Sequence, residues 1–433
     1  MSGPTAGPVE PSAGVGSVEP SSAAGSAEPS AGAGPDEPAA LPLSGIRVLE
    51  LASVIAAPYA GSLLRLLGAE VVKVEAPAGD PIRKWDSPRG PLPFAQINAG
   101  KRSVVIDLKT DEGVALVKGL LPDFDVLTHN LRPASMERLG LGAAACHEIN
   151  PRLVYLGVTG FGSTGPWAAR PAYDSIGQAF SGLLALLTPP GATPAVGPAL
   201  GDLGTGVVAA AGVLAALVQR ERTGRGSVVE TSLLEGTIAL IADQFSHLQA
   251  TGTQFNIATR ARTSGIFMSQ TADADLVVIH VSTSGKFFEA LTAALDRKDL
   301  VEDPRFRTFA DRSAHHEELQ SEILAVTRGL PTEALLDLLV RFDVPHTRVN
   351  SLRDLMEHPQ IEALGLFDDI DDASGMQFTG APWRIDGRRP GGVHDWPTQG
   401  RDTREVLGAL VGEEQLRKLH ERGVIDLGPD ATP

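Results

Sequence analysis

The fold is decided by residues 46–75, which run IRVLELASVIAAPYAGSLLRLLGAEVVKVE. Residues 46–51 form a short apolar run that is typical of a buried strand. Pro58 is a helix-start signal, the leucines after it recur with helical spacing, and Gly68 is a stop signal. Residues 70–75 predict a second strand. A strand, a helix and a strand joined by short connections predict a parallel βαβ unit.

The same alternation continues beyond this unit, so we expect a doubly wound α/β arrangement for the first part of the folded chain. Apolar runs and helical spacing predict the further elements of this part. The expected strands are at 103–108, 125–128, 152–159 and 228–232. The expected helices are at 112–121, at 202–220, and from the end of the 228–232 strand to about residue 250.

The pattern changes near residue 265, where a smaller α+β region is predicted to begin. Its expected elements are a strand at 276–280 and helices at 286–295 and 317–330, before an irregular stretch at 382–396 and a terminal helix at 405–421. We therefore expect a split large domain with a small domain inserted. The predicted boundaries are a tail at 1–40, the first part of the large domain at 41–250, a linker at 251–265, the small domain at 266–358, and a linker with the C-terminal return to the large domain at 359–433.

The first forty residues differ in composition from the rest. They are almost entirely Gly, Ala, Pro, Ser and Val with a few acids, and they contain no aromatic or basic residue. The unit VEPS at 9–12 recurs at 18–21 and, as AEPS, at 27–30. A segment of this kind buries too little apolar area to offset its chain entropy, so we predict that it is disordered.

Composition and charge exclude several classes of protein. The chain has 433 residues and a formal net charge of −16, which disfavours nucleic acid and anionic membranes as partners because phosphate binding needs a basic surface. Its single cysteine, Cys146, excludes an intrachain disulfide and fits a reducing compartment. The chain shows no long apolar run and no secretory signal, so we expect a cytoplasmic protein with no membrane partner.

Several site motifs are absent or misplaced. Residues 160–165, GFGSTG, match the G-x-G-x-x-G pattern, but Pro166 and Trp167 follow where a dinucleotide site needs a helix. No Walker phosphate loop and no G-x-S-x-G hydrolase elbow occurs. The ten histidines show no metal-ligand spacing, so we predict no metal site.

Carboxylate chemistry is the signal that remains. Asp202 lies in PALGDLGTG at 198–206, where the long helix is expected to begin. It suits an N-cap, because its oxygen can accept backbone N–H groups. It also suits a nucleophile, because the positive helix end favours the ionised carboxylate and the flanking glycines leave room for a large substrate. Asp174, which follows Pro171, is a second candidate, for a site role or for a turn.

Five landmarks, taken together and in this order, resemble the class III CoA-transferases, the family of formyl-CoA and carnitine CoA-transferases. The resemblance covers nearly everything from Leu43 to Leu427 and leaves out the tail. The landmarks are LSGIRVLE at 43–50 with Pro58, LGAEVVKVE at 67–75, Asn98 with KRS at 101–103, RPAYD at 170–174 with Gln178 and Ala179, and LGD at 200–202 followed by RTGRG at 222–226.

The resemblance implies a Rossmann-like large domain with a parallel sheet, a smaller α+β domain, and a homodimer of two interlocked subunits. It also implies that Asp202 attacks the thioester of a donor acyl-CoA, giving an aspartyl anhydride and then an aspartyl-CoA thioester. An acceptor carboxylic acid then takes the CoA by the reverse steps. No permanently bound cofactor is expected, since coenzyme A enters as a substrate.

The resemblance further implies a set of contacts with coenzyme A. Three of them belong to the loop after the first strand, and the others match positions that hold the nucleotide and pantetheine parts. Basic side chains there suit the phosphates, and surface salt bridges are their alternative role. The predicted contacts are Val54, Ile55, Ala56, Lys101, Asn130, Arg138, Tyr173 and Asp174.

Departures from the formyl-CoA branch bear on the substrate. Ile55 stands where that branch has Gln, Ala76 stands where it has Arg, and the stretch 261–265, ARTSG, does not match its mobile glycine loop. Oxalate is therefore not favoured, and the absence of an obvious cationic cluster favours a mono-acid or a bulky apolar acid. An α-methylacyl-CoA racemase of the same family is an alternative, although such enzymes have His where Tyr173 stands. A non-catalytic CoA-binding protein is the third.

Overall fold

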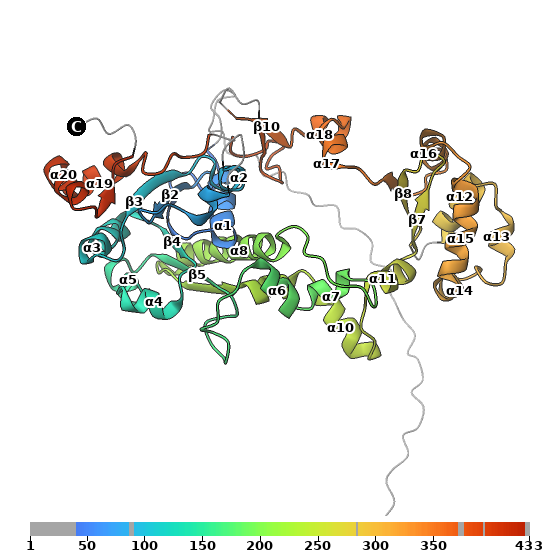
Figure 1. The fold of residues 1–433 in the computed structure, drawn as a ribbon, viewed down its shortest axis with the longest axis horizontal. Coiled ribbons are helices and arrows are strands. Elements are labelled where there is room, and N and C mark those ends of the chain that lie inside the picture. The colour runs from blue at the N-terminus through green and yellow to red at the C-terminus, as the bar shows by residue number, and fades with distance from the viewer. Residues whose placement is uncertain (1–39, 86–90, 283–284, 371–375, 393–394, 429–433) are drawn as a thin grey trace, which may run out of the picture. The chain divides into compact units, whose positions relative to one another are not determined.

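The computed structural model describes residues 40–85, 91–282, 285–370, 376–392 and 395–428 (Figure 1). The tail predicted at 1–40 lies outside the described residues, apart from Ala40. Residues Leu41–Pro433 form one compact unit. The division of this unit into a large and a small domain therefore stays a prediction.

The central sheet of the chain has seven strands in the order β12-β3-β2-β1-β4-β5-β6. All neighbouring strands are parallel except β12 and β3, which are antiparallel. The order 3-2-1-4-5-6 is that of a Rossmann sheet, so the predicted fold class is confirmed. The strands are β1 (Arg47–Leu51), β2 (Glu70–Glu75), β3 (Arg102–Ile106), β4 (Val126–His129), β5 (Val154–Thr159), β6 (Val228–Ser232) and β12 (Ile425–Asp426).

Helices cover both faces of this sheet. Successive residues of a strand point to opposite faces, so each strand presents apolar side chains to both layers of helices. On one face, Leu49 and Val72 pack with apolar residues of α3, α4, α5, α19 and α20. On the other face, Val48 and Val71 pack with α1, α8 and the start of α9. The helices are α1 (Ala56–Leu66), α3 (Asp111–Leu120), α4 (Pro133–Arg138), α5 (Ala143–Ile149), α8 (Leu200–Thr223), α9 (Leu233–Ala239), α19 (Thr403–Val411) and α20 (Glu413–Glu421).

A second sheet has three antiparallel strands in the order β7-β8-β9. Phe267, Val277 and Ile279 of this sheet share a separate apolar core with α12, α13, α15 and α16. The smaller α+β part of the predicted fold is thereby confirmed. Its elements are β7 (Ile266–Gln270), β8 (Leu276–His280), α12 (Gly285–Ala294), α13 (Asp299–Glu302), α14 (Phe309–Ala314), α15 (His316–Thr327), α16 (Thr332–Arg341) and β9 (His346–Arg348).

Shorter elements connect these two sheets and their helices. The strands β10 and β11 pair antiparallel, and Phe378 of β11 packs with Ala95 and Ala99 at helix α2. Helix α11 occupies most of the stretch predicted as a linker. These elements are η1 (Pro81–Lys84), α2 (Leu92–Asn98), η2 (Leu121–Asp123), α6 (Asp174–Phe180), α7 (Leu183–Leu187), α10 (Ala242–Thr251), α11 (Ile257–Ser264), α17 (Leu352–Met356), α18 (Pro359–Leu364), β10 (Phe367–Asp369) and β11 (Gln377–Thr379).

Two helices that were predicted as continuous are divided. The terminal helix ends at Gly412, whose φ of +76° no helix can contain, and restarts as α20. The helix expected to reach about residue 250 breaks at Leu240 and Ile241 into α9 and α10. The predicted bounds of β2, β6 and β8 agree with the structure residue for residue.

Helix α8 is long and apolar enough to cross a membrane by length and composition. However, 56% of its most apolar window is buried inside the protein. Ala209, Val213 and Leu217 lie there in the core that α8 shares with α1. Packing within the protein therefore accounts for the apolar composition of this helix.

Candidate active site

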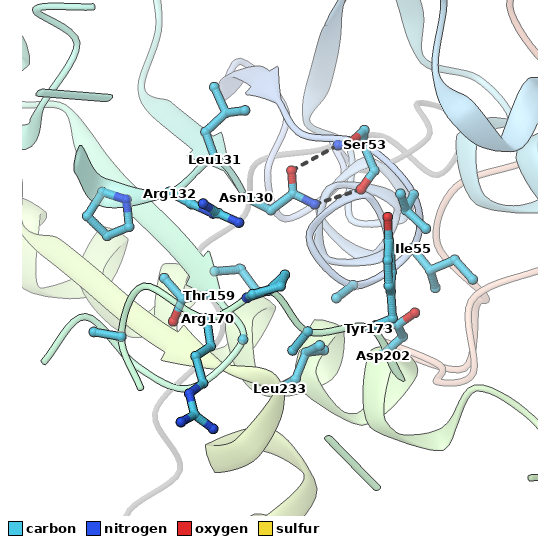
Figure 2. Close-up of a pocket in the computed structure, with 18 residues that line it drawn as sticks. Ser53, Ile55, Asn130, Leu131, Arg132, Thr159, Arg170, Tyr173, Asp202 and Leu233 are labelled. Carbon is cyan, nitrogen blue, oxygen red and sulfur yellow. Dashed lines mark hydrogen bonds between the residues drawn. The ribbon is translucent and has the colours of Figure 1, made fainter. Parts of the chain in front are cut away.

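A pocket of about 280 Å³ opens beyond the ends of β1, β4 and β5. The loops after β1 and β4 diverge here, which is the point where the strand order reverses and where doubly wound sheets bind ligands. Leu233 at the start of α9 closes one side (Figure 2). Six of the predicted site residues line this pocket, namely Val54, Ile55, Ala56, Asn130, Tyr173 and Asp202.

Asp202 is the third residue of α8, and the N-cap of that helix is Ala199. The backbone N–H of Asp202 donates to Oδ1 of Asp174 at 3.1 Å, so Asp174 supplies the acceptor at this helix end. No residue that the structure describes donates a hydrogen bond to the Asp202 carboxylate. Its alternative role as an N-cap is therefore wrong, and its side chain faces the pocket.

The electrostatic surroundings of Asp202 favour its neutral form. Burial and the nearby Asp174 carboxylate raise the pKa of Asp202 from 3.8 to about 7. Asp202 is only 8% exposed. Burial and Asp174 thus act against the helix end, which favours the ionised carboxylate. Once ionised, a carboxylate of this pKa is a stronger base than an ordinary aspartate.

Asp174 acts beside the pocket and does not line it. It lies in the first turn of α6, and its Oδ2 accepts a hydrogen bond from Nε2 of Gln178 at 2.6 Å. Gln178 also donates to the carbonyl oxygen of Pro198, just before α8, at 3.0 Å. Asp174 therefore joins α6 to the start of α8 and holds Asp202 in place. Its predicted contact with coenzyme A finds no support in this geometry.

The glycines that follow Asp202 serve helix packing. A Cβ atom at Gly204 would lie 2.6 Å from Cδ1 of Leu240. A Cβ atom at Gly206 would lie 2.8 Å from the carbonyl oxygen of Ala56. The contact at Gly206 is with backbone, so this position excludes a larger residue, whereas the end of the Leu240 side chain can move away from Gly204. That the glycines beside Asp202 leave room for a substrate stays a prediction.

The loop after β1 is held in an unusual conformation. Val54 has a φ of +68°, which costs a β-branched residue about 1–2 kcal/mol. The N–H of Ser53 donates to Oδ1 of Asn130 at 3.1 Å, and Nδ2 of Asn130 donates to the Ser53 carbonyl oxygen at 2.7 Å (Figure 2). The N–H of Val54 donates to both carboxylate oxygens of Asp80, at 3.2 and 3.3 Å. Side chains from other parts of the chain thus fix this wall of the pocket.

Tyr173 and Ile55 lie on the same side of the pocket as Asp202 (Figure 2). Tyr173 is the N-cap residue of α6 and is 70% exposed, an unusual degree for a large aromatic side chain. Its ring is therefore free to contact a ligand that enters the pocket.

Lys101 lies in the core and does not line the pocket. It is 1% exposed, and its Nζ is 2.9 Å from Oε2 of Glu50. The ammonium also donates to the carbonyl oxygen of Pro58 at 2.7 Å and to Oδ1 of Asn98 at 3.0 Å. Its donors are all used inside the protein, so its predicted contact with coenzyme A finds no support.

Arg138 lies at the last residue of α4, beside a different cavity of about 540 Å³. Lys109 and Lys118 line the same cavity. Three cations around one cavity suit a phosphate ligand. The contact of Arg138 with coenzyme A stays a prediction, at a site other than the pocket with Asp202.

Comparison with known proteins decides the family. The sequence matches CoA-transferase family III over residues 43–403. This chain belongs to CoA-transferase family III. It is 36% identical over 401 residues to succinyl-CoA–D-citramalate CoA-transferase of Chloroflexus aurantiacus, which covers 89% of this chain and 98% of that relative. It is 34% identical to succinate–glutarate CoA-transferase of Agrobacterium fabrum, over 78% of this chain and 88% of that relative.

Solved structures agree with this family III assignment. A CAIB/BAIF family protein from Brucella suis has a TM-score of 0.76 at 29% identity, covering 86% of this chain and 99% of its own. A protein from Mycobacterium tuberculosis has a TM-score of 0.76 at 30% identity, covering 85% of this chain and 99% of its own. The protein is thus an enzyme that transfers coenzyme A.

Two arginines that line this pocket were not predicted as site residues from the sequence. Arg132 lies in the loop after β4 and Arg170 in the loop after β5, and both line the pocket. The guanidinium of Arg170 stacks 3.9 Å from the centre of the Trp167 ring. Among the described residues, neither arginine forms an ion pair. Arg132 lies three residues beyond the carboxyl end of β4, and that position was the signal that could have identified it.

The residues around the two cavities suit different parts of coenzyme A. Across the segments that the structure describes, no three His, Cys, Asp or Glu side chains lie close enough together to hold a metal. Coenzyme A needs cations for its phosphates and a pocket for its reactive thioester end. The cavity beside Arg138 has the first property, and the pocket with Asp202 has the second.

Proposed function

We propose that this family III enzyme transfers coenzyme A from an acyl-CoA thioester to the carboxylate of a second acid, through covalent intermediates on Asp202. The placement of Asp202 carries the proposal: a buried carboxylate lines a pocket and has no cationic partner among the described residues. An arrangement of this kind is costly for the folded protein, and perturbed carboxylates of this kind cluster at functional sites.

The donor thioester reacts first. An oxygen of ionised Asp202 bonds to the thioester carbonyl carbon, the carbon–sulfur bond breaks, and CoA leaves as a thiolate. The product is a mixed anhydride of Asp202 and the acyl group. The thiolate then attacks the aspartyl carbonyl carbon, and the donor acid leaves as a carboxylate. CoA is now held as a thioester on Asp202.

The acceptor acid completes the exchange by the same steps in reverse. Its carboxylate attacks the aspartyl thioester, which gives a second anhydride and free CoA thiolate. The thiolate attacks the acceptor carbonyl carbon of this anhydride and regenerates the Asp202 carboxylate. Each step replaces one anion with another, so atoms and charge balance without an added proton or oxidant. The anhydride retains the reactivity of the thioester throughout.

We assign the two ends of coenzyme A to different cavities. The pocket of about 280 Å³ has room for the thioester and the end of the pantetheine arm beside Asp202. Lys109, Lys118 and Arg138 surround the cavity of about 540 Å³, and their charges suit the phosphates of the nucleotide. In this assignment Arg138 contacts coenzyme A as predicted, and Lys101 does not.

We propose that the acids exchanged are dicarboxylic. The two relatives described above are named for succinate, glutarate and citramalate. In this chain, Arg132 and Arg170 line the pocket and are free of ion pairs among the described residues, so either can bind a carboxylate that does not react. Because of these two arginines, we propose a dicarboxylic acid in place of the mono-acid expected from the sequence. That expectation rested on the lack of an obvious cationic cluster.

Mass spectrometry of trapped intermediates tests the proposal. The protein is incubated with succinyl-CoA, quenched in acid and digested, and the peptide that contains Asp202 is examined for an added CoA or acyl group. Glutaryl-CoA and acetyl-CoA serve as further donors. An adduct on Asp202 that disappears when glutarate is added as acceptor supports the proposal. Turnover without any adduct or isotope label at Asp202 would defeat it.

The racemase alternative predicts a different exchange. An α-methylacyl-CoA racemase would exchange the α-hydrogen of its substrate with deuterium from solvent, without any second acid. Tyr173 stands where a racemase has a histidine base, and a phenol is a poor base near neutral pH. Deuterium uptake at the α-carbon would favour the racemase. Binding of acyl-CoA with neither exchange would favour a non-catalytic protein.

We also propose that the active form is a homodimer. Large apolar side chains on α8 and near α9 and α10 are exposed in the single chain, including Val207, Val218 and Leu240. Exposed apolar surface of this extent commonly marks a protein–protein contact. Light scattering after gel filtration tests this: twice the chain mass of 45.3 kDa supports it, and a monomer contradicts it. A cytoplasmic location stays a prediction.

A further inference from the structure

The Val54 loop is the one wall of the Asp202 pocket that stands in a strained backbone conformation. Val54 follows β1 with a φ of +68°, in the left-handed region that β-branched residues avoid. Ser53, Val54 and Ile55 all line the pocket. A conformation of this kind persists only where surrounding groups hold it.

The group that holds Val54 is the carboxylate of Asp80. Both of its oxygens accept from the Val54 N–H, at 3.2 and 3.3 Å. Asp80 is 3% exposed and does not itself line the pocket. It therefore reaches the pocket only through the backbone of the loop.

Asp80 is itself fixed in position by the sheet. Its Oδ2 is 2.9 Å from Nζ of Lys73, a residue of β2 with no exposed surface. The Lys73 ammonium also donates to the carbonyl oxygen of Ala52 at 2.7 Å. The backbone N–H of Asp80 donates to Oε2 of Glu75 at 3.0 Å. Lys73 thus binds the loop at two points, directly at Ala52 and, through Asp80, at Val54 itself.

We propose that Asp80 is a positioning residue for CoA transfer, which fixes the Val54 loop so that the pocket accepts the thioester end of acyl-CoA beside Asp202. The inference rests on the proposed role of that pocket. A neutral or displaced side chain at position 80 loosens the loop, and binding of acyl-CoA weakens while the chemistry at Asp202 remains. The effect falls on KM and spares kcat.

The test compares Asp80→Asn with a matched control. Asp125 also accepts a backbone N–H, that of Arg47 at 2.9 Å, and pairs with the buried Arg220 at 2.9 Å, but it does not line or touch the pocket. We expect Asp80→Asn to raise KM for acyl-CoA by about tenfold or more, with kcat changed by less than about threefold. Asp125→Asn should lower the melting temperature and leave KM unchanged.

A second variant keeps the test decisive if Asp80→Asn does not fold. Asp80→Glu retains the charge opposite Lys73 but displaces the carboxylate, so it should also raise KM. Val54→Gly, added to either variant, should restore part of the lost affinity because glycine adopts a positive φ without strain. Rescue at position 54 would not follow from a merely structural role for Asp80.

Two results would overturn the inference. One is an unchanged KM in a folded Asp80→Asn or Asp80→Glu protein. The other is an equal rise of KM in Asp125→Asn, which would indicate a general effect of lost stability. Failure of the proposed function is distinguishable, because wild-type protein would then turn over without any adduct on Asp202, whatever the variants at position 80 do to KM.

Discussion

Two groups of buried carboxylates in this enzyme differ in what surrounds them. Glu50 and Asp80 are 0% and 3% exposed, yet each lies beside an ammonium group. Lys73 contacts both, at 3.2 and 2.9 Å, and Lys101 contacts Glu50 at 2.9 Å. Burial alone would lower the pKa of Lys73, but attraction to Glu50 and Asp80 outweighs it and raises the pKa. These ion pairs hold the loops around them.

The other group is the buried Asp202, with the half-buried Asp174 beside it. Asp202 lies next to a second carboxylate instead of a cation, so burial and repulsion both raise its pKa. The comparison teaches that the partner, and not burial by itself, makes a buried acid inert or reactive. Substitution of the acid or of its neighbour in each group tests this conclusion.

Removal of the reactive acid should have the largest effect. Asp202→Asn keeps the size of the side chain but cannot form an anhydride, so kcat for CoA exchange should fall by at least about 10³-fold. Asp311→Asn is the control, because Asp311 is also the third residue of its helix but its carboxylate accepts from Thr308. Steady-state kinetics with succinyl-CoA measure both. Comparable losses in the two variants would contradict the assignment of Asp202.

Removal of a cation from the inert group should mainly affect stability. Lys101→Met leaves Glu50 with less compensation inside the core, so the free energy of unfolding should fall by about 3–5 kcal/mol. Lys286→Met is the matched control, since Lys286 pairs with Asp343 at the same 2.9 Å but both side chains are exposed. Its loss should be below about 1 kcal/mol. Denaturant unfolding measures both, and equal losses would refute the comparison.

The reactive acid should itself cost stability at neutral pH. The pKa of Asp202 is about 7 in the folded protein, against 3.8 for an ordinary aspartate. The favourable contribution of its protonated form is therefore complete below about pH 4 and is lost as the pH rises through about 7. Asp202→Asn should be more stable than the wild type by up to about 4 kcal/mol at about pH 8, and equal to it at about pH 3. Unfolding at both pH values measures the difference, and a constant difference would exclude this pKa.

The smallest effect should come from the partner of the reactive acid. Only ionised Asp202 can attack, so kcat/KM should rise with pH with a midpoint near pH 7 and level off above about pH 8. Asp174→Asn removes the repulsion but leaves the burial, so the midpoint should move to lower pH by up to about one unit. The activity at about pH 6 should then rise a few fold at most. Identical pH profiles for the two proteins would show that Asp174 does not tune Asp202.

The sequence was sufficient for local structure and insufficient for what distant segments do together. The bounds of β2, β6 and β8 follow from short apolar runs between turn residues, which are local patterns. The order of the strands depends on pairings between distant residues, and no local pattern states it. The break at Leu240 and Ile241 was missed for the same reason, since a long apolar stretch hides the start of a new helix.

The same limit explains which site residues were predicted from the sequence and which were not. Asp202 and the loop at Val54 were identified because they belong to recognisable local motifs. Lys101 was predicted to contact coenzyme A because it matches a position that does so in the family it resembles, and a basic side chain suits phosphates. Its burial depends on Glu50, which lies in a different strand. Arg132 was missed because its place in the pocket depends on where β4 lies in the sheet.

The pairing of β12 with β3 has a consequence for synthesis of the protein. β3 is synthesised long before Ile425 and Asp426, which pair with Ile106 and Val105. Until then β3 presents an open edge, and the apolar side chains beneath α19 and α20 remain uncovered. A ribosome-bound chain must therefore keep this edge from associating with other strands until β12 emerges. During this delay a chaperone would have most to protect.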